Sequence, residues 1–133
     1  MASSRFVHDA TLDAGKAPPE VEVIFGNAQV GNYICNLWES SSATTSKEIS
    51  HGNNVDTVID RFSIGEPATS LRGKLLGITL LIQTPTPGPG EMFSATLLIR
   101  QGNDVVGGGV VHDSGMFPAG ADSISRLHFV RLL

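Results

Sequence analysis

The stretch KLLGITLLIQTPTPGPGEMFSATLLIRQGNDVV, residues 74–106, decides the fold class of this chain. On both sides of its proline-rich centre, apolar side chains alternate with small or polar ones, which is the pattern of strands with one buried face. The inward sets are Leu76, Ile78, Leu80 and Ile82 before the centre, and Phe93, Ala95, Leu97 and Ile99 after it. Leu75 and Leu81 lie on the other face of the first strand, which suggests a strand covered on both sides. Proline lacks an amide hydrogen and cannot continue a ladder, so residues 84–90 predict a loop.

The same stretch ends in a predicted hairpin. Gly102 and Asn103 join the strand-like runs LLIRQ and DVVGG. Glycine followed by asparagine suits a two-residue turn with a positive φ at its first central residue.

Further strand-like segments lie on both sides of this stretch, at residues 20–25, 28–38 and 55–64. The polar stretch at residues 39–54 predicts a surface loop, with a short strand at KEIS as an alternative. The C-terminal run SISRLHFVRLL, residues 123–133, fits either strand alternation or helical spacing. We favour a strand because every other convincing element is one.

Together these segments predict an all-β fold, namely an antiparallel β-sandwich of seven to eight strands with jelly-roll or Ig-like topology. A barrel is the second choice. Residues 1–19 show little periodicity and end in APP, so we expect an N-terminal arm or a loosely docked segment. Residues 20–133 are then a single β-sandwich domain.

Composition excludes several partners. The chain has 133 residues, 9 basic against 13 acidic residues and a net charge of −4, and its basic residues are scattered. A nucleic-acid partner requires a basic stripe, so we expect no nucleic-acid partner and no binding to anionic membranes.

The sequence shows neither a signal peptide nor an apolar run of membrane-spanning length. We therefore expect no membrane insertion and a soluble, cytoplasmic protein, with signal-independent export left open. The lone Cys35 sits in an apolar run and suggests a buried thiol.

The motif NDVVGGGVVHDSG, residues 103–115, contains residue types found in active sites, but its spacing does not predict an active site. No helix follows the glycines, as a phosphate-binding loop would require. In a strand, His112 and Asp113 point to opposite faces, and His112 and Ser114 lie about 6.6 Å apart, too far for a nucleophile and its base. Three glycines in a strand indicate a bulge beside a bulky side chain or a close approach of another backbone, a ligand or a second subunit. These candidates are Gly107, Gly108 and Gly109.

Other candidate groups are equally weak. Asp56 and Asp60 share a strand face but lie about 13 Å apart, which is too far for a catalytic pair. No histidine stands in a zinc-binding spacing, so we expect neither a metal nor a cofactor. The single Trp38 is expected to fill the core, with sugar stacking at a strand end as the alternative.

These observations lead to two functional hypotheses. The first is a non-enzymatic recognition or self-assembly module, expected to be a homo-oligomer, because no catalytic cluster is visible and edge strands need partners. Its narrower form is a lectin-like module with a carbohydrate or protein partner. The candidate contacts are Trp38, His51, Asn53, Asn54, His112 and Asp113. The second is a small enzyme or ligand-binding barrel in which distant groups converge. Its members are Asp56, Asp60, His112 and His128.

Overall fold

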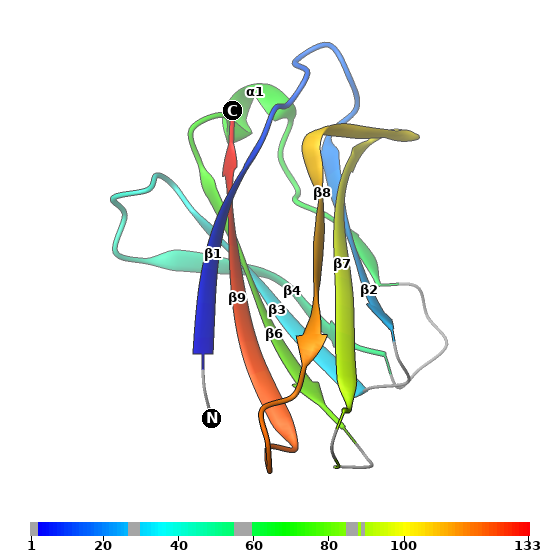
Figure 1. Cartoon of the computed structure of the whole chain (residues 1–133). Coiled ribbons are helices and arrows are strands. Elements are labelled where there is room, and N and C mark those ends of the chain that lie inside the picture. The colour runs from blue at the N-terminus through cyan, green and yellow to red at the C-terminus, as the bar shows by residue number, and fades with distance from the viewer. Residues whose placement is uncertain (1–2, 27–29, 55–59, 85–87, 89) are drawn as a thin grey trace.

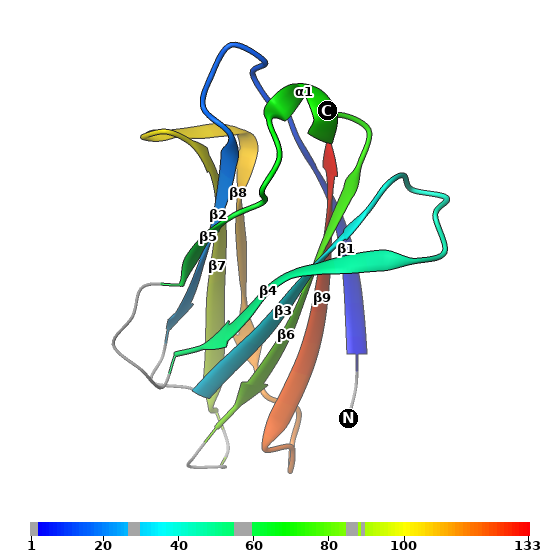
Figure 2. The same cartoon turned by 180° about the vertical axis from the view of Figure 1, so that it is seen from behind.

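Two β-sheets pack face to face in the computed structural model of the chain, as Figures 1 and 2 show from opposite sides. The structure describes residues 3–26, 30–54, 60–84, 88 and 90–133. The predicted all-β sandwich is confirmed, and within the described residues the sheets do not close into a barrel.

The five-stranded sheet has the order β1-β9-β6-β3-β4, and the four-stranded sheet has the order β5-β2-β7-β8. The strands of the first sheet are β1 (Ser3–Ala10), β9 (Ser123–Leu132), β6 (Leu75–Gln83), β3 (Val30–Trp38) and β4 (Ser46–Asn53). Those of the second are β5 (Arg61–Ser63), β2 (Pro19–Gly26), β7 (Met92–Gln101) and β8 (Asp104–Met116). One helical turn, α1 (Ala68–Leu71), precedes β6.

The alternating segments supply the core. The inward side chains of β6 and β7 are buried, and each fully buried leucine or isoleucine contributes about 1.5–3 kcal/mol. These two strands are consecutive in the chain but belong to opposite sheets, so the connection between them crosses from one layer to the other. Cys35 is buried in the same core, and burial raises the pKa of its thiol to about 12.

The β7–β8 hairpin has the predicted turn. Gln101 pairs with Asp104 across Gly102 and Asn103, and Gly102 has a φ of 65°. The C-terminal segment is strand β9, which pairs antiparallel with β6, so strand alternation and not helical spacing was the right choice there.

Residues 39–54, expected as a loop, contain a full edge strand. Here β4 pairs with β3 from Trp38 with Ser46 to Asn32 with Asn53, and the register shifts between Cys35 and Asn36. This polar segment is a strand because its backbone hydrogen-bonds to β3. Its own residue types do not favour a strand, so its sequence resembles a loop. Together with β1, it brings the described strands to nine, more than the seven or eight expected.

The N-terminal segment contains the edge strand β1, which lies beside β9 in Figure 1. Its pairing is parallel, running from Ser3 with Ser125 to Ala10 with Leu132, whereas the other pairs of described strands are antiparallel. The connection to β2 is held by the buried side chain of Gln101. Its Nε2 donates to the carbonyls of Asp13 and Ala17 at 2.7 and 3.0 Å.

The backbone of β1 also explains the glycine-rich stretch. The β7–β8 ladder is irregular between Leu98–Val110 and Arg100–Val105, and residues 106–109 bulge there. The amide of Thr11 donates to the carbonyl of Gly107 at 2.8 Å. Gly108 has a φ of 73°, and a Cβ at this position would collide with the carbonyl oxygen of Asp9. The close approach at Gly108 is therefore that of the β1 backbone of the same chain, whereas a Cβ at Gly109 would meet Val106 and the carbonyl oxygen of Ile99.

Candidate functional site

Trp38 lies on the outer face of the five-stranded sheet and not in the core between the sheets. It alternates with the buried Leu37, is half-buried, and meets the ring of Phe129 edge-on at 5.7 Å. The indole lies over Gly77, where a Cβ would collide with it. The prediction that Trp38 fills the core was wrong, because the odd-numbered residues of β3 face inward.

Three other candidate contacts lie near the end of β4, on the same sheet. The exposed His51 pairs with Glu48 at 3.3 Å. With Asn53 it lines a shallow cavity of about 260 Å³ that also includes Ile34. Asn54 has a structural role, since its side-chain oxygen accepts a 2.8 Å hydrogen bond from the amide of Gly31.

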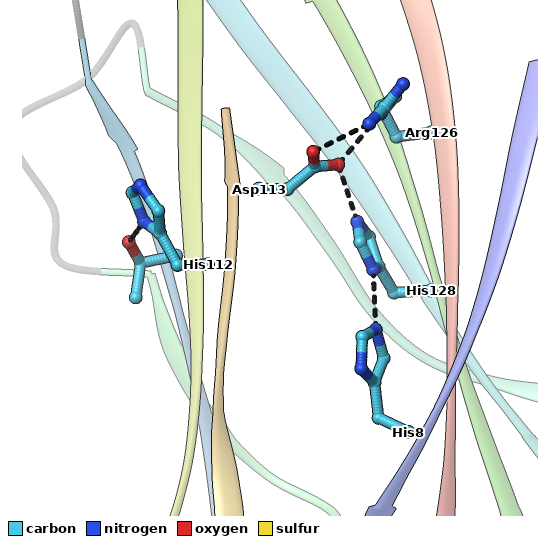
Figure 3. A network of polar contacts seen from close by, with 6 residues as sticks. His8, His112, Asp113, Arg126 and His128 are labelled. Carbon is cyan, nitrogen blue, oxygen red and sulfur yellow. Dashed lines mark hydrogen bonds and ion pairs between the residues drawn. The ribbon is translucent and has the colours of Figure 1, made fainter. Parts of the chain in front are cut away.

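His112 and Asp113 point to opposite faces of β8, as Figure 3 shows. His112 is exposed on the outer face of the four-stranded sheet, where its Nδ1 lies 2.9 Å from Thr96 Oγ1. Asp113 points into the space between the sheets. The six candidate contacts therefore do not surround one site.

The residues of the enzyme hypothesis do not converge either. Asp60 lies near the hydroxyl of Tyr33, 3.4 Å away, whereas His128 is buried between the sheets and His112 is outside them. Asp56 falls outside the described residues.

The structure does assemble one polar network, from residues on β1, β8 and β9 (Figure 3). Arg126 donates to both carboxylate oxygens of Asp113, from Nε at 2.8 Å and from Nη2 at 2.7 Å. His128 Nε2 lies 2.8 Å from Asp113 Oδ2, and His128 Nδ1 lies 3.0 Å from His8 Nε2. Phe6 stacks on His128 at 5.0 Å, and the Arg126 guanidinium lies over the Phe6 ring at 4.6 Å.

Charges in this network determine the direction of its hydrogen bonds. Burial alone would raise the pKa of Asp113, but hydrogen bonds from Arg126 and His128 hold it below its ordinary value. An ionised Asp113 is only an acceptor, so His128 donates from Nε2. In neutral His128, Nδ1 then accepts from Nε2–H of His8. Burial and the neighbouring His128 lower the pKa of His8, against the opposite effect of Asp113 and Asp9.

Sequence reasoning assigned Asp113 and His128 to different hypotheses and gave His8 no role. A signal was available, since Phe6, His8 and Ala10 share one face of β1, and Arg126, His128 and Val130 share one face of β9. Alternation does not reveal that these two strands are neighbours.

A second feature is the outward surface of the five-stranded sheet, which we call the apolar face. It carries Val7, Ile34, Trp38, Leu75, Leu81, Leu127 and Phe129. Strand register makes these side chains neighbours: Val7 is level with Phe129 on the adjacent strand, and Ile34 is level with Thr79, which is level with Leu127. Val7 is 64% exposed and Ile34 is 44% exposed, so large apolar side chains here face solvent.

Comparisons of this chain with family models, with curated proteins and with solved structures gave no match. In the described part of the chain, no three histidine, cysteine or acidic side chains are grouped as ligands of one metal ion. None of the helices described is of a length and apolarity to cross a bilayer.

Proposed function

We propose that this protein is a non-enzymatic self-assembly module that pairs with a second copy through its apolar face. The observation that carries the proposal is the set of large apolar side chains on that face, of which Val7 is 64% and Ile34 is 44% exposed. Contiguous exposed apolar surface on a protein marks an interaction site. Aromatic residues such as Trp38 and Phe129 are enriched at the core of such interfaces.

The outer face of the four-stranded sheet is a weaker candidate. It also exposes apolar side chains, namely Ile24, Met92, Val110 and Met116. Ile24 is level with Thr96 and His112 across the sheet, and none of these four apolar side chains is aromatic. The six candidate sugar contacts lie apart, so the geometry also favours self-assembly over carbohydrate binding.

Two valines on opposite sheets provide a matched test. Val7 on β1 and Val110 on β8 are both outward-facing edge-strand residues, 64% and 58% exposed. We expect Val7→Glu to shift the protein toward monomer in sedimentation velocity, because glutamate would bury an unpaired charge in the interface. Val110→Glu should sediment like the wild type.

Circular dichroism of both variants checks that the fold is unchanged. Dissociation by Val110→Glu and not by Val7→Glu would move the interface to the four-stranded sheet. A wild-type monomer at hundreds of micromolar would refute self-assembly.

A further inference from the structure

We infer that the two copies bind about a two-fold axis that runs parallel to the strands and passes over β6. This inference rests on the proposed function and adds the symmetry of the pair and the ion pairs that select it. It starts from the strand order, in which β6 is the central strand and β1 and β4 are the edges.

The first step is geometric. A half-turn about an axis along β6 exchanges the two sides of the sheet, so β1 of one copy faces β4 of the other. Residues at the same level then meet across the interface. Leu127 and Ile34 are both level with Thr79, so Leu127 of each copy faces Ile34 of the other.

The second step is the charge at the two edges. Arg5 is exposed on the outward side of β1 and forms no ion pair with a described residue. At the opposite edge, the side chain of Glu48 is 53% exposed, with His51 at 3.3 Å. His51 stands at the level of Ile34, Thr79, Leu127 and Arg5. The axis along β6 therefore places each Arg5 opposite His51 of the second copy. Glu48 stands one outward level further along β4, at the level of Val7, so the long Arg5 side chain reaches it diagonally across the interface, twice by symmetry.

An axis perpendicular to the strands lacks this complementarity. It would lay β1 on β1, where the outward groups near Arg5 are Val7 and Asp9. The Asp9 carboxylate already accepts from Arg131 at 2.6 and 3.0 Å. Arg5 would then meet a carboxylate whose two oxygens are both engaged, which disfavours that arrangement. In Glu48, the contact from His51 is to Oε2 alone.

The third step is the shape of the central strand. Gly77 lies on β6, directly on the axis, and its missing side chain leaves room for the indole of Trp38 above it. Leu75 and Leu81 of β6 also lie on the axis, so each meets its own equivalent in the other copy. Both are half-buried by the chain itself, and the second copy would complete their burial.

The size of the face indicates a weak dimer. Five strands about 4.8 Å apart and four outward levels about 6.7 Å apart span about 600 Å² in each copy. A standard interface buries about 800 Å² per partner, so we expect dissociation in the micromolar range. The contact is self-complementary and closes at two copies.

Charge exchange tests the axis. Arg5→Glu places a glutamate against Glu48 in its homodimer, and Glu48→Arg places arginine against arginine. We expect each variant alone to dimerise about tenfold more weakly than the wild type in sedimentation velocity at low salt. An equimolar mixture should recover the wild-type constant, because both contacts of the heterodimer are then of opposite charge.

The control pair is Arg61→Glu mixed with Glu48→Arg, since Arg61 lies on the four-stranded sheet. Its heterodimer keeps one contact of arginine with arginine and should stay weaker than the wild-type dimer. Wild-type dimerisation without rescue in the Arg5→Glu mixture would overturn the axis and leave self-assembly standing. A wild type that stays monomeric would overturn both.

Discussion

Asp113 is the residue on which the buried polar network depends. It is 8% exposed and accepts hydrogen bonds from Arg126 and from His128, which is itself 2% exposed. Charged groups that are this deeply buried need a partner, because a desolvated charge without a partner is costly. The carboxylate thus links β8 of one sheet to β9 of the other.

We expect Asp113→Asn to lower the free energy of unfolding by about 3 kcal/mol, because it leaves the Arg126 guanidinium half-paired in a poorly hydrated position. Urea titration at pH 7.5 measures the change. The control is Asp104→Asn, whose side chain is 69% exposed beside Lys16 and should change stability by less than about 0.5 kcal/mol. Equal effects of the two variants would show that the network contributes no more than a surface pair.

His8 should make stability depend on pH. Its pKa in the folded protein is lowered from 6.5, so the folded state resists protonation and the unfolded state does not. Stability from this group is complete above pH 6.5 and falls as the pH falls below it. Against the effect of burial, Arg126 and His128 lower the pKa of Asp113 from 3.8, so Asp113 stays ionised in that window.

The measurement compares urea unfolding at pH 7.5 and pH 5.5. We expect the wild type to lose more stability on acidification than His8→Gln does. His112→Gln, on the outer face of the other sheet, should behave like the wild type. If His8→Gln loses as much stability as the wild type on acidification, the pH dependence comes from other groups.

At the scale of elements, the close approach of β1 to β8 requires a glycine at position 108. Gly108 requires a positive φ and leaves no space for a Cβ beside Asp9, whereas a Cβ at Gly107 would meet only Thr11, at 3.9 Å. Of these two adjacent glycines, the contacts therefore explain Gly108 and not Gly107.

We expect Gly108→Ala to lower the free energy of unfolding by about 2–4 kcal/mol, from backbone strain and from the clash with β1. Gly107→Ala should change it by less than about 1 kcal/mol. Urea titration of both variants gives the comparison. A harmless Gly108→Ala would mean that β1 can move away from β8 at little cost.

The strands themselves were largely predictable because alternation is a local property. Leu76 to Ile82 and Phe93 to Ile99 were assigned to the core, and the Gly102 turn was identified by its residue types. Strand β4 was not predicted at full length, since its polar residues are held by hydrogen bonds to β3. Trp38 was misplaced because a strand dense in apolar residues does not reveal which face is inward.

At the scale of the whole molecule, the two sheets use their outer faces differently. Leu75 and Leu81 already suggested from the sequence that their strand is covered on both sides. The core covers one side of β6, and the proposed second copy would cover the other. The polar network lies between the two sheets, on the inner side of the five-stranded sheet, so the second copy would not contact it.

The sequence alone determined the fold class and the main core strands, because each depends on residues within one segment. Tertiary structure decided the strand order, the parallel pairing of β1 with β9, and the meeting of His8 with His128. These two residues are separated by 120 positions. Such contacts depend on which strands become neighbours, and period-two alternation specifies a strand's faces without specifying its partners.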